Sequence, residues 1–196
     1  TLFVLKFKKF TAMNIQYPEI GICGLSCRLC PCFHTQGASR CVGCKSDYRM
    51  GAGCPFITCA VKRKGIEFCW DCAEGETCPR WAGHRQFRLE HDTFVSYQKL
   101  EDNIRFVRQH GIEPFEADQK QREQILRAML AEFNEGRSKR LYSIAATVME
   151  IEELEAALLQ ARNTSQGMDI KEKARVLHTI LNAIASEKRY VLTLRK

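Results

Sequence analysis

The chain has 196 residues, with 30 Lys and Arg against 23 Asp and Glu, a formal net charge of +7, and eleven cysteines. This length is enough for one large domain or two small ones. The composition excludes a collagen-like or disordered chain, and no apolar run approaches the ~20 residues that a membrane span needs. All eleven cysteines lie between Cys23 and Cys78, so the two halves of the chain are expected to differ in kind.

Residues 1–16 form a basic arm that contains Lys6, Lys8 and Lys9 and no acidic residue. Alternating apolar residues in this arm predict a strand or a frayed end. Only four apolar residues precede Lys6, whereas the core of a signal peptide needs about 7–15. We therefore expect a cytoplasmic protein, in which thiols stay reduced and bind metal instead of forming disulfides.

Residues 17–88 form a cysteine-rich region whose cysteines follow an ordered spacing. Its clearest features are two C-x2-C turns, Cys41-Val-Gly-Cys44 and Cys69-Trp-Asp-Cys72. Such a turn places two thiolates on one side of a tight loop, which is half of a tetrahedral metal site. Gly43 suits the first turn because glycine readily takes a positive φ. We predict a metal-binding module whose candidate ligands are Cys23, Cys27, Cys30, Cys41, Cys44, Cys54, Cys59, Cys69, Cys72 and Cys78.

Two arrangements of these ligands are open. In the sequential arrangement, the first and second pairs along the chain bind one ion, and the third and fourth pairs bind the other. In the interleaved arrangement, the first and third pairs bind one ion, and the second and fourth pairs bind the other. Both predict two zinc ions with four cysteine ligands each. The four pairs are Cys27 with Cys30, Cys41 with Cys44, Cys54 with Cys59, and Cys69 with Cys72.

An iron–sulfur cluster is the alternative cofactor. Three Cys-Pro steps, at Cys30, Cys54 and Cys78, resemble the Cys-Pro that closes iron–sulfur motifs. The spacing Cys23-x3-Cys27-x2-Cys30 suits three corners of a [4Fe–4S] cluster. The same spacing occurs in radical-SAM enzymes, but their long barrel of alternating strands and helices does not fit the helical sequence that follows. The roles of Cys32 and of His34, a possible further ligand, stay open.

A set of motifs resembles a known family. These are Cys23-Gly24-x2-Cys27-x2-Cys30-Pro31, Cys41-x-Gly43-Cys44, Cys59-Ala60, Lys64-Gly65, and Cys69-x2-Cys72 with a closing Cys78. Together they resemble a prokaryotic cysteine-rich family of unknown function, common in anaerobic bacteria and archaea. The resemblance covers about residues 20–80 and implies a cytoplasmic metal-binding module that holds zinc or an iron–sulfur cluster. The segment 133–140 is also similar to the tail of longer members.

Residues 89–196 are predicted to be an all-α bundle of five helices. Phe94, Leu100, Ile104 and Val107 recur at helical spacing, and Gly111 suits the end of that helix. Further apolar faces mark helices over about 125–133, 138–148, 151–158 and 170–184. Ser138 and Asp169 are the predicted N-caps of the third and fifth helices. The predicted fold is a small irregular, metal-stabilised cysteine-rich module followed by this bundle.

The positive charge lies on the first 88 residues, because residues 89–196 carry seventeen basic and seventeen acidic residues. Two sites, each with four thiolates around a divalent ion, would add about −4 to this region, which weakens the case for nucleic-acid binding. Lys62, Arg63 and Lys64, together with Arg80, Arg85 and Arg88, could instead neutralise the thiolates. A partner protein is therefore the favoured ligand, nucleic acid an alternative, and no membrane contact is expected.

No catalytic constellation is evident in the sequence. His84, His91, His110 and His178 are isolated and are predicted to be surface or capping residues. Arg137, Lys139 and Arg140 at a helix start could hold an anion, although a solvated helix end is the simpler interpretation. The sequence thus favours an accessory or protein-interaction protein that binds zinc, with an iron–sulfur redox or carrier protein and a nucleic-acid-binding module as alternatives.

Overall fold

The computed structural model of the protein describes residues 14–46 and 54–196. The predicted basic arm lies outside these residues except for its last three. Within the described ranges the chain is helical, with one isolated β-bridge between Ile20 and Ser26 and no strand. The helices are α2 (Pro55–Ile57), α3 (Pro79–Arg88), α4 (Leu100–His110), α5 (Ile112–Phe133), α6 (Lys139–Val148), α7 (Ile151–Thr164) and α8 (Ile170–Lys188).

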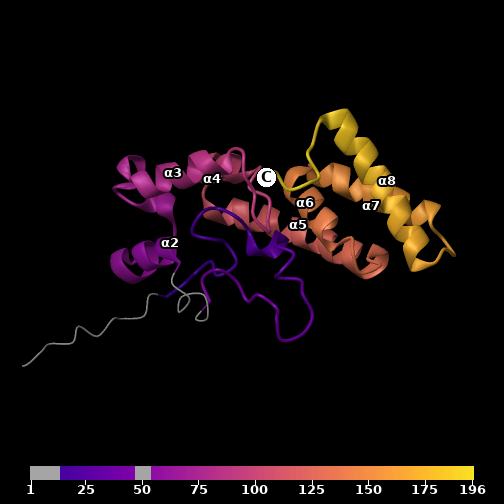
Figure 1. Ribbon diagram of the computed structural model, residues 1–196, viewed down its shortest axis with the longest axis horizontal. Coiled ribbons are helices and arrows are strands. Elements are labelled where there is room, and N and C mark those ends of the chain that lie inside the picture. The colour runs from indigo at the N-terminus through magenta and orange to yellow at the C-terminus, as the bar shows by residue number, and fades with distance from the viewer. Residues whose placement is uncertain (1–13, 47–53) are drawn as a thin grey trace, which may run out of the picture.

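Helix α5, the longest with 22 residues, connects the two ends of the elongated molecule (Figure 1). Its first turns lie beside α4 and the cysteine-rich loops, and its later turns pack against α6, α7 and α8. The chain returns to the middle after α8, where Arg195 binds Asp92 ahead of α4. No helix in the described part of the chain is long and apolar enough to cross a bilayer.

The predicted helical bundle is confirmed over α5–α8. Apolar side chains at helical spacing on these four helices form one continuous core, in which Leu126, Met129, Leu154, Leu177 and Leu181 are fully buried. The same periodicity that marks these helices in the sequence therefore supplies the contacts that hold them together.

Helix ends follow the predicted signals, with one exception. Gly111 ends α4 with φ of 90°, and Asp169 caps α8 through hydrogen bonds to Lys171 N and Glu172 N of 2.8 and 2.9 Å. Ser138 does precede α6, but its side chain makes no capping hydrogen bond. Its hydroxyl binds Glu135 and His178 instead.

Two features of the predicted helices are wrong. Phe94 is not part of the helix that contains Leu100, because α4 begins only at Leu100, and the Phe94 side chain is 53% exposed. Ile170 was expected on the apolar stripe of the last helix, but it is 43% exposed in the first turn of α8. Both residues match the periodicity of a neighbouring helix while lying at or beyond its end, where packing is incomplete.

The cysteine-rich region consists of short turns instead of long helices. Cys27–Leu29 (η1), Cys69–Asp71 (η3) and Gly75–Thr77 (η4) are 3-10 turns, and Thr58–Lys64 (η2) is a π-helix that continues α2. Cys54 and Cys78 each precede a helix whose first residue is proline. These two Cys-Pro steps therefore have a simple role as helix starts, since proline is favoured at the first helical position.

The expectation that residues 17–88 contain almost no core is only partly right. Small clusters of buried residues lie here, and the largest contains Ile20, Phe68, Trp70 and Trp81. This cluster is completed from the second half of the chain by Leu100, Ile104 and Val107 of α4 and Phe115 of α5. The domain boundary predicted at residue 88 therefore does not coincide with a division between hydrophobic clusters, because this cluster contains residues from both sides of it.

Leu29 and Arg28 connect the cysteine-rich region to the bundle. Turn η1 packs against α5 and α6, and it inserts Leu29 into the bundle core. Arg28 Nη1 lies 2.7 Å from Glu123 of α5, and its Nη2 lies 3.3 Å from Glu19. The turn that carries Cys27 and Cys30 is thus held at the bundle by one apolar and one ionic contact.

Candidate functional site

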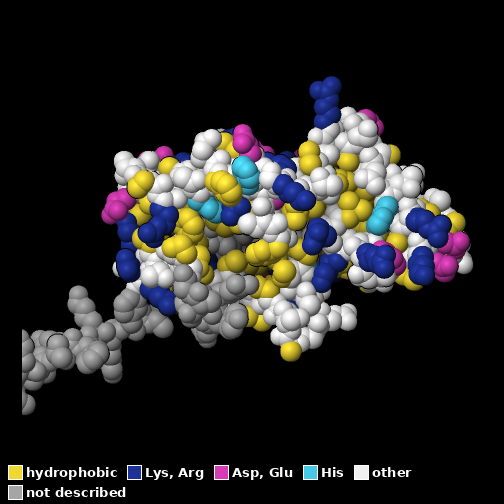
Figure 2. Space-filling model, in the orientation of Figure 1, with side chains coloured by type: hydrophobic (Ala, Val, Ile, Leu, Met, Phe, Trp, Pro, Cys, Tyr) yellow, Lys and Arg dark blue, Asp and Glu magenta, His cyan; other side chains and the backbone are white. Residues whose placement is uncertain are grey.

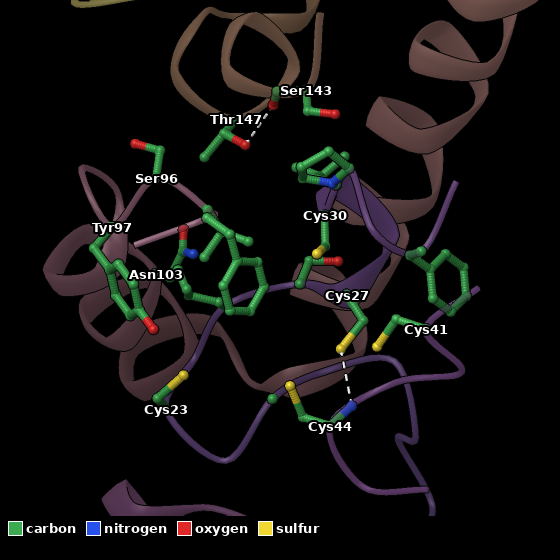
Figure 3. Close-up of a pocket in the computed structure, with 18 of the residues that line it drawn as sticks. Cys23, Cys27, Cys30, Cys41, Cys44, Ser96, Tyr97, Asn103, Ser143 and Thr147 are labelled. Atoms are coloured by element: carbon green, nitrogen blue, oxygen red, sulfur yellow. Dashed lines mark hydrogen bonds between the residues drawn. The ribbon is translucent and has the colours of Figure 1, made fainter. Parts of the chain in front are cut away.

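A cavity of about 240 Å³ lies between the cysteine-rich loops, the segment before α4, and α6. Six cysteines line it: Cys23, Cys27, Cys30, Cys41, Cys44 and Cys54. Figure 3 shows the sulfur atoms of Cys27, Cys41 and Cys44 near one another at one side, with Cys30 nearer to α6 and Cys23 across the cavity. Hydrophobic side chains gather around the centre of the same face of the molecule (Figure 2).

The first group of thiols joins two turns that are adjacent in the sequence. Cys30 N donates to Cys27 O over 3.0 Å within η1, and Cys44 N donates to Cys27 Sγ over 3.4 Å. Hydrogen bonding to the Cys44 side chain, and then burial, raises the pKa of Cys27. Burial, together with the thiols of Cys32 and Cys41, raises the pKa of Cys30 to about 12. Without a metal these thiols hold their protons, so a metal must displace them to bind.

The second group of thiols surrounds Cys69. Its turn, η3, repeats the geometry of η1, because Cys72 N donates to Cys69 O over 3.3 Å. Burial and the neighbouring thiols raise the pKa of Cys69 to about 12. Those neighbours are Cys23, Cys59, Cys78 and Cys72.

The thiols do not divide cleanly into either predicted arrangement of pairs, because Cys23 lies near Cys44 and Cys54 and also near Cys69. The turn at Cys27 meets the turn at Cys41, and Cys69 meets Cys59 and Cys72. Cys23 does not join the first group as a corner beside Cys27 and Cys30. Burial raises its pKa to about 11, and the thiols that add to this effect are Cys44 and Cys54. In the described residues, no three His, Cys, Asp or Glu side chains converge closely enough to hold a metal ion.

One lysine contacts a thiol, and a second is buried beside Glu67. Lys64 Nζ lies 3.2 Å from Cys72 Sγ and 2.8 Å from Glu74, so the predicted pairing of this lysine with a thiol is confirmed. Lys45, directly after Cys44, has a fully buried side chain that lies 2.6 Å from Glu67 and 3.8 Å from the centre of the Phe68 ring. Burial lowers the pKa of Lys45, and the adjacent Glu67 opposes that effect. A thiolate beside either cation would be stabilised.

The arginines of α3 have internal partners instead of thiols. Arg85 binds Glu101 of α4 through two hydrogen bonds, one of them 2.8 Å long. Arg88 stacks over Tyr97 with its guanidinium carbon 4.3 Å from the ring centre. The prediction that this trio neutralises thiolates is therefore wrong for Arg85 and Arg88. Both arginines are also less available for the phosphates of a nucleic acid.

His34, a possible metal ligand, uses one ring nitrogen within its own loop. Its Nε2 donates to the carbonyl oxygen of Arg28, and burial lowers the pKa of the ring. Coordination through Nε2 would require breaking this hydrogen bond. His91 has the capping role expected of it, because its Nδ1 contacts Phe87 O near the end of α3 over 3.2 Å.

His84 is the histidine whose environment the sequence did not reveal. It lies among the rings of Phe56, Trp81 and Tyr97 and lines the cavity. Its Nε2 is buried without a hydrogen-bond partner, and burial lowers the pKa of the ring to about 4. These three aromatic residues stand at unrelated spacings in the sequence, so no periodic signal could have found it.

Ser138, His178 and Glu135 resemble a nucleophile with its base but do not form one. Ser138 Oγ lies 2.7 Å from His178 Nε2, and the same hydroxyl donates to Glu135. In a catalytic triad the carboxylate binds the histidine, not the serine. Ser138 is also 1% exposed and lies outside the cavity lining. These contacts fasten α8 to the start of α6.

No family model, curated protein or solved structure matches this chain. The resemblance to a cysteine-rich family therefore depends on the cysteine motifs alone. The fold and site define a helical bundle that carries a loop-rich cysteine region with two groups of thiols.

Proposed function

We propose that the cysteine-rich region binds two zinc ions and serves as a metal-stabilised interaction module attached to the helical bundle. The first site uses the two adjacent turns, with the ligands Cys27, Cys30, Cys41 and Cys44. The second is built around Cys69 and Cys72, with further ligands among their neighbours Cys59, Cys78, Cys23 and Cys54. When bound, zinc would cross-link loops that have little regular structure.

The grouping of thiols supports this proposal most directly. Four sulfurs from two turns form the donor set that zinc prefers, and the Cys44 N–H that reaches Cys27 Sγ is the kind of hydrogen bond that supports a metal thiolate. Lys64 supplies a similar contact to Cys72 in the second group. The chemistry of the donors fits zinc, while their present separation does not, so binding would draw the sulfurs together.

The burial of these thiols also supports a metal role. Cys27 and Cys30 are buried among other cysteines, where ionised sulfurs would repel one another. A divalent cation removes this repulsion and makes the thiolate the favoured state. Binding should therefore release protons and should strengthen as the pH rises.

Metal analysis of the purified protein tests the proposal. Anaerobic purification followed by elemental analysis should give about two zinc ions per chain. Cys41→Ser should remove one ion and Cys72→Ser the other, while the control Cys32→Ser, outside the proposed ligands, should retain both. A protein that binds no metal in the presence of excess zinc would overturn the proposal.

The same experiment separates zinc from an iron–sulfur cluster. A cluster would give a brown protein with iron and acid-labile sulfide, and it would make the chain a redox or carrier protein. Zinc is favoured here because the Cys44 N–H contacts Cys27 Sγ and so joins two C-x2-C half-sites of the kind that zinc uses.

A further inference from the structure

One face of α6 forms a wall of the cavity away from most of the thiols. Arg140, Ser143, Ile144 and Thr147 line the cavity at positions i, i+3, i+4 and i+7 of the helix, which places them on one side. Phe94 and other apolar residues of the cysteine loops and of the segment before α4 complete this part of the lining. We call this part of the cavity the apolar end.

Ser143 brings an unused polar group to the apolar end. The residue is 2% exposed, and its Oγ is buried without a hydrogen-bond partner. Thr147 Oγ1 donates to the carbonyl oxygen of Ser143 over 2.8 Å, so it does not occupy the hydroxyl (Figure 3). Buried hydroxyls in native proteins are nearly always paired. An unpaired one beside a cavity therefore points to a bound polar atom.

The charge of the cavity lining has a single source. Arg140 is exposed and is the only charged side chain among the described residues that line the cavity. It makes no ion pair with any residue in the described part of the chain, whereas Lys139 beside it binds Thr35 Oγ1 over 3.0 Å. His84 is neutral at physiological pH because burial lowers its pKa to about 4. A ligand here therefore meets one positive charge and no carboxylate.

The volume sets the size of the ligand. An apolar cavity of roughly 150 Å³ is large enough to bind benzene. The cavity here is about 240 Å³, so an apolar body of roughly ten non-hydrogen atoms would fit.

We propose that the apolar end of this cavity binds a small monocarboxylate with an apolar body, whose carboxylate contacts Arg140 and Ser143. An arginine can donate two parallel hydrogen bonds to a carboxylate, and the serine hydroxyl one turn further along α6 can donate a third. The contacts of this site use no cysteine ligand, although the four ligands of the first proposed metal site line the same cavity.

Octanoate is the probe that tests the proposal. Isothermal titration calorimetry on the purified full chain should show saturable binding in the micromolar to millimolar range. Arg140→Gln should weaken binding by about tenfold, because it removes a charge-assisted contact. Ser143→Ala should weaken it by about threefold, and this variant should fold well because it removes an unpaired buried hydroxyl.

Matched controls keep the result specific. Arg137→Gln makes the same change of charge at an exposed residue just before α6 that does not line the cavity, so it should leave binding unchanged. 1-Octanol, with the same chain and no charge, should bind equally to the wild type and to Arg140→Gln. Methyl resonances of Ile144, in the lining, should shift with octanoate, and those of Ile180, on α8, should not.

Three results would overturn the proposal. One is the absence of saturable binding in the millimolar range. Another is equal loss of affinity in Arg137→Gln and Arg140→Gln, which would show only general attraction to a basic helix end. The last is tighter binding of 1-octanol than of octanoate. Zinc analysis of every variant separates these outcomes from a failure of the metal proposal.

Discussion

The helical bundle and the cysteine-rich region are stabilised in different ways. In the bundle, apolar faces of α5–α8 share one large core, and most ion pairs lie outside it. In the cysteine-rich region the apolar clusters of the described residues are small, and charged side chains are buried between them, notably Lys45 and Glu67. The large shared core supplies apolar burial to the first region, whereas we propose that the second uses metal cross-links to offset its chain entropy.

Removal of bound metal should give the largest difference in stability between the two regions. Chelation of zinc should unfold the loops of the cysteine-rich region and leave α5–α8 helical, because a structural zinc is worth roughly 10–16 kcal/mol in small modules. Hydrogen exchange followed by mass spectrometry, with and without chelator, measures each region separately. If the cysteine-rich region keeps its protection from hydrogen exchange without metal, the burial of its small clusters is sufficient to fold it. The proposed difference between the two regions would then be wrong.

The ionic contact between the two regions provides the next largest expected effect. Arg28→Ala should destabilise the protein by about 3 kcal/mol, because it leaves the buried Glu123 without its inner partner. Chemical denaturation measures the change. The matched control is Arg127→Ala, since Arg127 contacts the same Glu123 but is 61% exposed. Equal losses from the two variants would show that burial of Arg28 does not strengthen its pairing.

A pH titration tests the aromatic surroundings of His84. The pKa of His84 is lowered to about 4 from an ordinary value of 6.5, mainly by burial. Between these values the unfolded chain binds a proton that the folded chain does not, so stability should fall as the pH falls from 6.5 to 4. Allowing for partial solvent exposure, the expected loss is about 1–2 kcal/mol.

Substitution of His84 isolates this effect. His84→Phe should flatten the dependence of unfolding free energy on pH between 4 and 6.5, and thermal denaturation at several pH values measures it. The control, His91→Phe, removes a histidine whose Nδ1 contacts the end of α3. A slope that is the same in wild type and His84→Phe would place the titration on another group.

The smallest effect is expected on the surface of the bundle. Arg162 of α7 and Glu132 of α5 form an ion pair whose side chains are 47% and 37% exposed. Arg162→Ala should therefore change the unfolding free energy by less than about 1 kcal/mol. A loss as large as that of Arg28→Ala would show that the bundle too depends on ionic contacts.

The sequence reveals the two regions unequally, for a physical reason. Helices α6–α8 and the second half of α5 leave a periodic apolar pattern, and Asp169 marks the start of α8, so these parts were predictable from local signals. The first half of α5, from Ile112, was not predicted, because its buried residues include the polar Gln119, Arg122 and Glu123. Helix α3 carries only one fully buried apolar residue, Trp81, and no such pattern announces it. The cavity was not predictable, because residues as distant as Cys23, His84 and Ser143 meet only after folding.

The pairing of the cysteines could also be predicted only in part from the sequence. Spacing identifies Cys27 with Cys30 as a local turn, which the hydrogen bond from Cys30 N to Cys27 O closes. The Cys44 N–H donates to Cys27 Sγ, a contact with the other turn that spacing does not reveal. Which turn faces which depends on the path of the chain between them. The contact between Cys44 N and Cys27 Sγ therefore follows from the folded path of the chain and not from the spacing.

Turn η1 has a consequence for how the protein would respond to its surroundings. Within four residues it carries Cys27 and Cys30 on the side of the thiols and Leu29 in the core of the bundle. A change that shifts this turn, such as oxidation or alkylation of either thiol, must also displace a core side chain. If metal binding keeps η1 in its present place, binding at the thiols would stabilise the bundle, and a more stable bundle would raise the affinity of the thiols for the metal. A modification that shifts η1 would instead destabilise the bundle.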